Sequence, residues 1–259
     1  MSEQHLLELK GVDKRFGAVQ ALNAVDFHAD VGQVMALVGD NGAGKSTLIK
    51  CVAGIHPIDE GEVVFDGEQV NIHGPKDAAR LGIEVVYQDL ALADNLDVVQ
   101  NMYLGRELTD PLRRMDETTM EAKAQETLRS LSVTTLQSVR QTVAGLSGGQ
   151  RQSVAVAKAV LWNSKLVILD EPTAALGVAQ TRQVLDLVRR LAEQGLAVVI
   201  VSHNMNDVFE VADYITVLRL GQNVAEFKRS ETTQREVVEA ITAGQLQKVP
   251  GMQEEEAVT

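Results

Sequence analysis

The chain has 259 residues, 45% of them hydrophobic, which is enough for a sizeable core in one large domain or two small ones. Its formal net charge is −12, and this argues against a nucleic-acid binder, because such proteins normally present a basic face. A single cysteine excludes an internal disulfide and fits a reducing compartment. No stretch approaches the ~20 consecutive apolar residues of a membrane span, and the first five residues lack the layout of a signal peptide. We therefore expect a globular, cytoplasmic protein.

The N-terminal region is predicted to be partly antiparallel. Residues 6–12 alternate as a strand does, residues 14–17 are expected to turn, and residues 25–29 form a second short strand. Residues 63–65 look like a further strand, and Asp66-Gly67 after them is typical of a tight hairpin turn. These strands are expected to pack beside a separate core.

That core begins with the apolar residues 34–38, which lead directly into a glycine-rich loop. The loop fits the pattern G-x-x-x-x-G-K-[ST], and residues 48–53 after it are predicted to form a buried helix that ends near Gly54. Glycines let the backbone N–H groups turn inward, and a helix N-terminus adds partial positive charge, so the segment can cradle phosphates. An accidental match is the alternative, but a strand before and a helix after disfavour it. The predicted nucleotide-binding residues are Gly39, Asn41, Gly42, Ala43, Gly44, Lys45, Ser46 and Thr47, with Lys45 reaching the β- and γ-phosphates and Ser46 able to ligate Mg²⁺.

The middle of the chain is predicted to be helical. A buried strand at residues 83–87 ends at Gln88, and from about residue 98 to 161 we find helical spacing and no convincing strand. Asp116 can cap one helix, and a second follows the segment Ser147-Gly148-Gly149.

Strand and helix alternate in the last third of the chain. The expected order is a buried strand at 166–169, a helix at about 178–193, a strand at 197–201, a hairpin at 214–227 and a final helix at 231–243. The predicted fold class is therefore α/β, with a mostly parallel sheet, an N-terminal antiparallel β subdomain and an α-helical insertion at about 89–163. We assign residues 1–244 to this domain and expect the acidic residues 245–259 to be a disordered tail.

Polar side chains follow three of the predicted parallel strands. Asp170 and Glu171 end the strand at 166–169, His203 comes just after the strand at 197–201, and Gln88 follows the strand at 83–87. In a parallel sheet this end faces the ligand crevice, so Asp170 could hold Mg²⁺ and Glu171 could act as general base. His203 could hydrogen-bond the γ-phosphate and the attacking water, and Gln88 could contact Mg²⁺ or that water. Taken alone, each could be an ordinary strand end.

The segment Leu146-Ser147-Gly148-Gly149-Gln150 has no obvious role in its own chain's site. Ser147 can cap the helix that follows, and the glycines leave N–H groups uncovered, which gives a second anion-binding helix end. Because it lies in the helical insertion, a symmetric partner is better placed to use it than its own chain. This predicts a dimer that closes on nucleotide, against the alternative of an ordinary helix start.

Together these residues resemble the ATPase subunits of ATP-binding cassette (ABC) transporters, from about residue 6 to 244. By that resemblance, Phe16 is the aromatic that stacks on adenine, residues 39–47 are the Walker A loop, Gln88 belongs to the Q-loop and His203 is the switch histidine. Residues 146–150 match the LSGGQ signature, and Asp170 and Glu171 match the Walker B aspartate and the catalytic glutamate. The resemblance implies two cassettes that close head-to-tail over two ATP molecules with Mg²⁺, each contacted by Ser147, Gly149 and Gln150 of the opposing chain.

Two further segments, residues 101–107 and 171–178, resemble monosaccharide importers of the ribose, xylose and fructose kind. This implies a peripheral subunit on the cytoplasmic face of the membrane that binds transmembrane permease subunits, with a sugar-binding protein as an indirect partner. With one cassette, the chain would pair with itself or with a sister subunit. Gly177 departs from the family, whose D-loop usually has aspartate there, so contacts across the dimer could differ.

Two other functions fit the same residues less well. A soluble ABC ATPase acting on the ribosome, DNA or cluster assembly is disfavoured by the single cassette and the negative charge. A nucleotide sensor that does not hydrolyse is disfavoured because Glu171 and His203 are both present. Among the remaining polar residues, Cys51 is predicted to be small and buried, and the four other histidines lack metal-ligand spacing along the sequence: His5, His28, His56 and His73.

Overall fold

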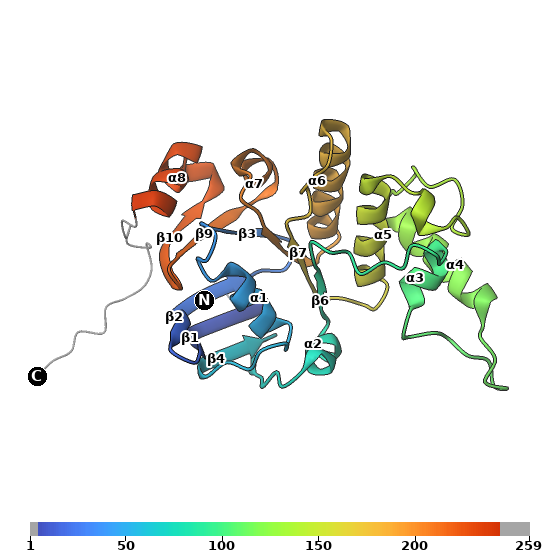
Figure 1. Cartoon of the computed structure of the whole chain (residues 1–259), viewed down its shortest axis with the longest axis horizontal. Coiled ribbons are helices and arrows are strands. Elements are labelled where there is room, and N and C mark those ends of the chain that lie inside the picture. Colours follow the sequence, from blue (N-terminus) through green and yellow to red (C-terminus); the bar gives the residue numbers. More distant parts are fainter. Residues whose placement is uncertain (1–4, 244–259) are drawn as a thin grey trace, which may run out of the picture.

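The computed structural model describes residues 5–243 and contains two sheets that share one core. The larger is six-stranded, in the order β10-β9-β3-β8-β7-β6, and the smaller is four-stranded, in the order β2-β1-β4-β5. Figure 1 shows the smaller sheet packed beside α1, and the helices α3, α4 and α5 gathered at the opposite end of the molecule. The predicted α/β fold with an antiparallel region and a helical region is confirmed. The predicted tail at 245–259 lies outside the described residues.

The six-stranded sheet is parallel except at one edge. Its strands are β3 (Val34–Val38), β6 (Ile83–Val86), β7 (Leu166–Asp170), β8 (Ala197–Val201), β9 (Tyr214–Arg219) and β10 (Gln222–Lys228). The first five run parallel, and only β10 pairs antiparallel, with β9. The central strands are almost wholly buried and apolar, as expected for strands covered on both faces. Their carboxyl ends consequently lie along one edge of the sheet.

The antiparallel sheet is larger than its sequence pattern indicates. Its strands are β1 (Leu7–Phe16), β2 (Val19–Ala29), β4 (Glu60–Phe65) and β5 (Glu68–Gln69). The predicted turn at 14–17 is wrong, because β1 continues to Phe16 and pairs with Val19 across a shorter turn. Shifts of register between β1 and β2 break the regular alternation that sequence reasoning relies on. The turn at Asp66-Gly67 is confirmed, with both residues at positive φ.

Helices cover both faces of the parallel sheet. They are α1 (Lys45–Val52), α2 (Pro75–Leu81), α3 (Val98–Tyr103), α4 (Glu117–Ser130), α5 (Gly148–Val160), α6 (Val178–Glu193), α7 (Met205–Val211) and α8 (Gln234–Ala243), with 3₁₀ turns at Val143–Gly145 and Arg229–Glu231. Neither α2 nor α7 was predicted, since seven residues give too little periodicity. None of the helices within residues 5–243 is both long and apolar enough to cross a bilayer.

Strand β3 joins the two halves of the core. Val34, Ala36 and Val38 face the cluster under the helices, while Met35 and Leu37 face the cluster shared with α1 and the antiparallel sheet. All five side chains are buried. A strand clamped on both faces gives the loop that follows it a rigid base.

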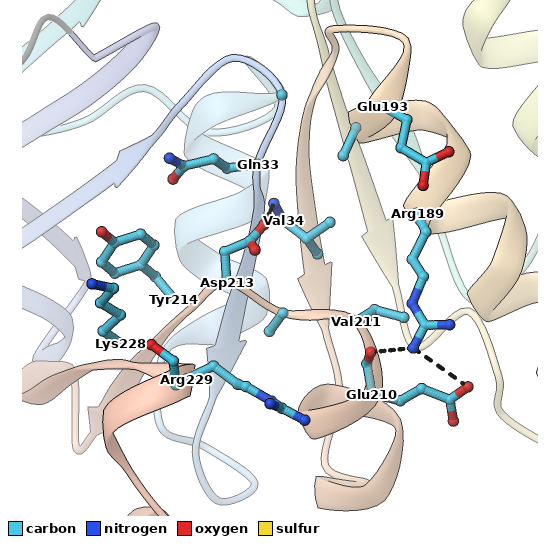
Figure 2. Close-up of a pocket in the computed structure, with 14 residues that line it drawn as sticks. Gln33, Val34, Arg189, Glu193, Glu210, Val211, Asp213, Tyr214, Lys228 and Arg229 are labelled. Atoms are coloured by element: carbon cyan, nitrogen blue, oxygen red, sulfur yellow. Dashed lines mark hydrogen bonds and ion pairs between the residues drawn. The ribbon is translucent and has the colours of Figure 1, made fainter.

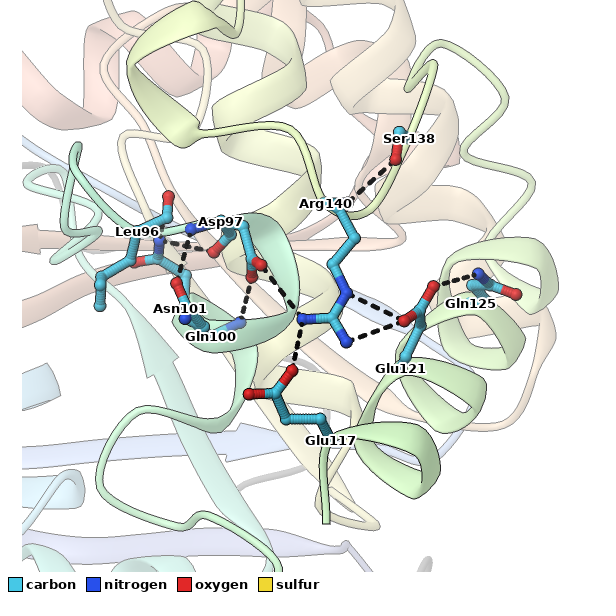
Figure 3. A network of polar contacts seen from close by, with 9 residues as sticks. All are labelled: Leu96, Asp97, Gln100, Asn101, Glu117, Glu121, Gln125, Ser138 and Arg140. Atoms are coloured by element: carbon cyan, nitrogen blue, oxygen red, sulfur yellow. Dashed lines mark hydrogen bonds and ion pairs between the residues drawn. The ribbon is translucent and has the colours of Figure 1, made fainter. Parts of the chain in front are cut away.

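Within the helical region, Arg140 joins several carboxylates (Figure 3). Arg140 lies 3.3 Å from a carboxylate oxygen of Asp97, 3.2 Å from Glu117 and 2.8 Å from Glu121, which joins the start of α3 to α4. The Glu121 and Asp97 carboxylates raise the pKa of the Arg140 guanidinium, with the hydrogen bond to Glu121 as the main cause. The helices that pack around α5 are thus joined to one another by ion pairs.

Candidate nucleotide-binding site

The glycine-rich loop between β3 and α1 has the backbone that its sequence predicts. Gly39 has φ +148°, and a Cβ there would lie 2.2 Å from the carbonyl oxygen of Leu218. Gly44 has φ +104°, and a Cβ would meet Ala21 O at 2.9 Å. Both positions therefore require glycine. Gly42, at φ +81°, also favours glycine, but a Cβ there would meet nothing within 4 Å. The loop wraps closely around its own scaffold on one side and leaves space on the other, where a phosphate would fit.

Lys45 is folded back into this loop. Its ammonium donates to the carbonyl oxygens of Gly39 at 2.7 Å and Asp40 at 3.0 Å. Burial lowers the pKa of Lys45, although the nearby Glu171 and Asp170 carboxylates act in the other direction. Lys45 is buried, and its ammonium donates to backbone carbonyls that an anionic ligand can replace as acceptor. Next to it Ser46 is exposed at the start of α1, where first-turn N–H groups have no partner within the helix.

The predicted strand-end residues do lie along one edge. The registers of β3, β8, β7 and β6 place the phosphate loop, His203, the pair Asp170-Glu171 and Gln88 after neighbouring parallel strands. Burial raises the pKa of the Asp170 carboxyl, and the adjacent Glu171 adds to this, while Lys45 opposes it. The raised pKa means that ionising Asp170 is costly in the chain alone. A cation bound beside the carboxylate would reduce that cost.

Glu171 and His203 are in direct contact. His203 Nδ1 lies 2.8 Å from Glu171 Oε1, and the histidine side chain is 74% exposed while the glutamate is only 17% exposed. Glu171 also has φ +50°, a left-handed conformation that is unusual for a residue with a side chain and that turns it out of the β7 direction. The sequence placed these residues on two strand ends but did not show that they hydrogen-bond.

A second contact, not foreseen from the sequence, braces the same turn. Thr173 Oγ1 donates to Asp207 Oδ2 at 2.6 Å, and Asp207 is almost fully buried on α7. This hydrogen bond links the turn after Glu171 to the helix that follows His203. No sequence signal marks Asp207, because the short α7 was itself unpredicted.

Phe16 lies at the tip of the β1–β2 hairpin and is 44% exposed. Its ring meets the His56 ring edge-on at 5.0 Å, and Lys14 Nζ lies 5.5 Å from its centroid. An exposed aromatic held by neighbours in this way has a face free to stack on a planar ligand.

The segment 146–150 is organised around a capping box. Ser147 Oγ accepts from Gln150 N at 3.3 Å, and Gln150 Oε1 accepts from Ser147 N at 2.8 Å. Gln150 Nε2 also donates to Thr135 O at 2.7 Å, so the polar contacts of this segment stay in the helical region. The predicted cap is confirmed, and the exposed Ser147 and Gly148 leave the end of α5 open to another molecule.

The D-loop region packs onto this segment within the chain. A Cβ on Gly148 would lie 2.9 Å from Leu176 Cδ2, and one on Gly149 would lie 3.1 Å from Gln180 Cβ. Gln180 Oε1 in turn accepts from Gly177 N at 3.3 Å. Gly177 itself has a free surface, since a Cβ there would meet nothing within 4 Å.

A separate hollow lies at the other end of the parallel strands (Figure 2). Its lining comes from the starts of β3 and β9, the end of β10, and the helices α6 and α7. Arg189 of α6 and Glu210 of α7 are joined there by an ion pair at 3.7 Å. None of the predicted site residues lines it. The candidate site is instead an open edge of the sheet, which a second surface could cover.

Comparisons with known proteins agree with this arrangement. The sequence model of the family described as ABC transporter matches residues 22–174. The chain belongs to the ABC transporter family. The resemblance seen in the sequence is thereby confirmed, and the unit is an ABC-type ATPase that binds nucleotide.

Two relatives match almost end to end. One is the fructose import ATP-binding protein FrcA of Rhizobium meliloti, which is 44% identical, with 93% of this chain and 95% of the relative covered. The other is the xylose/arabinose import ATP-binding protein XylG of Sulfolobus acidocaldarius, which is 46% identical, with 94% of this chain and 96% of the relative covered.

Solved structures share the fold. A nucleotide-free ATP-binding cassette from an ABC transporter superposes with a TM-score of 0.80 at 26% identity, covering 93% of this chain and 96% of that one. A dimeric bacterial ABC transporter cassette superposes with a TM-score of 0.73 at 26% identity, covering 86% and 98%.

Proposed function

We propose that this cassette binds Mg²⁺–ATP between two chains and uses its hydrolysis to drive import of a monosaccharide through permease subunits. The main evidence is that the phosphate loop, Asp170, Glu171 and His203 lie at the carboxyl ends of neighbouring parallel strands. The names of the two relatives, both monosaccharide import proteins that this chain spans almost fully, support the transport role.

The residues divide the chemistry between them. The loop N–H groups and Lys45 bind the phosphates, while Ser46, Asp170 and Gln88 supply the oxygen ligands that Mg²⁺ prefers. Bound Mg²⁺ would supply charge neutralisation at the phosphates. Glu171 accepts a proton from the attacking water as general base, and His203 holds its carboxylate in place through the 2.8 Å contact.

The partner chain is proposed to complete the site. Ser147 and Gln150 lie at the open end of α5, and their own polar contacts remain in the helical region, while Gly149 beside them is buried against Gln180. A second copy placed head-to-tail would bring this helix end over the phosphates, where its N–H groups and partial positive charge stabilise anionic oxygens. A structural relative forms a dimer, which supports this arrangement.

The permease is proposed to bind the segment at about 90–105, between the Q-loop and the end of α3. The cassette would then be peripheral on the cytoplasmic face of the membrane, with a sugar-binding protein on the other side as an indirect partner. The buried Asn101 makes this surface rigid, because its side chain accepts from Ala93 N at 2.7 Å and donates to Ala93 O at 3.0 Å.

Co-purification tests the transport role. Tagged protein from detergent-solubilised membranes of its own host should bring down a hydrophobic permease, identified by mass spectrometry. Recovery of ribosomes or DNA-bound proteins without any membrane protein would contradict the transport role and support the soluble alternative. That outcome would not contradict the ATPase activity.

A further inference from the structure

Two histidines far apart in the sequence meet where the two sheets join. His5 precedes β1 and His28 lies near the end of β2, and their rings stack with centroids 4.2 Å apart. The backbone holds them there, because Leu6 N donates to Ala29 O at 3.0 Å. Sequence spacing gave no reason to group these residues, since twenty-two positions separate them.

Two carboxylates face the same rings. Asp30 Oδ1 lies 2.7 Å from His5 Nδ1, and Asp30 Oδ2 lies 4.0 Å from His28 Nε2. Glu226, on β10 of the other sheet, lies 3.6 Å from His28 Nδ1. The four side chains are 19–24% exposed, so the group is sheltered but open to solvent.

The group has the composition of a transition-metal site. One ligand atom from each of His5, His28 and Asp30 lies within 4.8 Å of the others. Atoms bound tetrahedrally to one Zn²⁺ lie about 3.4 Å apart, so small side-chain rotations would bring all three to a shared ion. Imidazole with carboxylate suits Zn²⁺, Co²⁺, Ni²⁺ or Cu²⁺ better than Mg²⁺ or Ca²⁺.

Glu226 fits the role of an outer partner. If His28 Nδ1–H donates to this carboxylate, the lone pair of Nε2 faces Asp30 and the position an ion would take. A divalent cation would offset the repulsion between the two acids.

We propose that His5, His28 and Asp30 form a binding site for a divalent transition-metal ion, with Glu226 orienting His28. Such an ion would join the segment before β1 to the end of β2, and β10 would be tied to it only through the contact between Glu226 and His28. Asn223 already links the two sheets nearby, because its side chain exchanges hydrogen bonds of 2.8 Å with the backbone of Asp26. The site is structural and separate from the nucleotide-binding edge.

Co²⁺ titration of the full-length, untagged, chelator-treated chain tests the proposal, because tetrahedral Co²⁺ has strong visible absorption bands. Excess Mg²⁺ and no nucleotide keep the phosphate site from contributing. Wild type should bind one equivalent, displaceable by Zn²⁺, and His28→Asn and His5→Asn should each weaken binding at least about tenfold. His73→Asn removes an exposed histidine elsewhere and should bind as wild type does.

Thermal melts of the same proteins give the second readout. Zn²⁺ should raise the Tm of wild type and His73→Asn but not of His28→Asn. Absence of Co²⁺ bands in wild type, or equal binding by His28→Asn and wild type, would overturn the proposal and leave the group as an ion-pair cluster. If His28→Asn does not fold, His5→Asn, at the edge of the fold, carries the comparison. ATP hydrolysis by His5→Asn should equal that of wild type, so the result is independent of the proposed function.

Discussion

At the scale of single residues, Glu171 is the sharpest test of the chemistry. Its side chain is largely buried and contacts His203 at 2.8 Å, so Glu171→Gln keeps the shape while removing the base. We expect ATP affinity close to wild type and turnover reduced at least about 100-fold, measured by nucleotide binding and phosphate release. Glu193→Gln, an exposed change at the end of α6, should retain full activity. Near-normal turnover in Glu171→Gln would remove the assigned role.

Lys45 tests the phosphate loop. Its ammonium donates to two backbone carbonyls, and burial lowers its pKa. Lys45→Ala should weaken nucleotide binding at least about tenfold, since hydrogen bonds to charged groups are worth about 1.5–3 kcal/mol. Lys76→Ala, on exposed α2, is the matched control for loss of one positive charge. Nucleotide affinity is measured by fluorescence titration. An unchanged affinity in Lys45→Ala would argue against the predicted phosphate-binding loop.

The identities of the site residues could be predicted from the sequence, but the contacts between them could not. The glycine positions, Lys45 and the acids after β7 follow from local chemistry that is visible in the sequence. The contacts between Glu171 and His203, and between Thr173 and Asp207, depend on how strand ends and a short helix pack, and no local pattern encodes them.

At the scale of helices and strands, the cap of α4 was predicted and is present. Asp116 accepts from Thr119 N at 3.1 Å and from Thr119 Oγ1 at 2.7 Å, and these hydrogen bonds lower its pKa. Because its pKa is lower in the folded chain than in the unfolded chain, the stabilisation is complete above about pH 4 and is lost as pH falls through the folded pKa.

Substitutions of Asp116 test this pH dependence. Asp116→Ala should lower the Tm by a few degrees at pH 7, and the difference from wild type should shrink as the pH falls below about 4. Asp116→Asn, which keeps an acceptor, is the control and should lose less. A difference that stays constant with pH would contradict a role for the charge.

The α1 helix gives a chemical test of packing. Cys51 is 4% exposed, and burial raises the pKa of its thiol to about 11. At pH 8 about 0.1% of such a thiol is ionised, so iodoacetamide should label the native chain at least about 100-fold more slowly than the urea-unfolded chain. Rapid labelling of the native chain, counted by mass spectrometry, would show that α1 opens readily.

Element prediction failed where elements are short or irregular. The seven-residue helices α2 and α7 were missed, and β1 was ended too early because its ladder with β2 shifts register. The buried strands gave clear patterns because each is a continuous apolar run, and α6 did so because its apolar stripe recurs along a helix of 16 residues.

At the scale of the whole molecule, the two ends of the parallel sheet differ. The hollow in Figure 2 is built from one chain, at the amino ends of the strands, whereas the nucleotide-binding residues follow the opposite, carboxyl ends. The sequence indicated a second surface over the carboxyl ends through the segment 146–150, which was predicted to act in trans, with an ordinary helix start as the alternative. It could not show that His5 and His28 meet, since their contact depends on how the two sheets are joined.

Light scattering during size-exclusion chromatography of the Glu171→Gln chain tests the central claim most directly. With Mg²⁺–ATP we predict a species of twice the 28.1 kDa chain mass, and without nucleotide a single chain. Adding Ser147→Arg, which blocks the open end of α5, should return the mass to one chain in ATP. A mass that does not change with ATP, or a dimer that survives Ser147→Arg, would contradict a site shared between two cassettes.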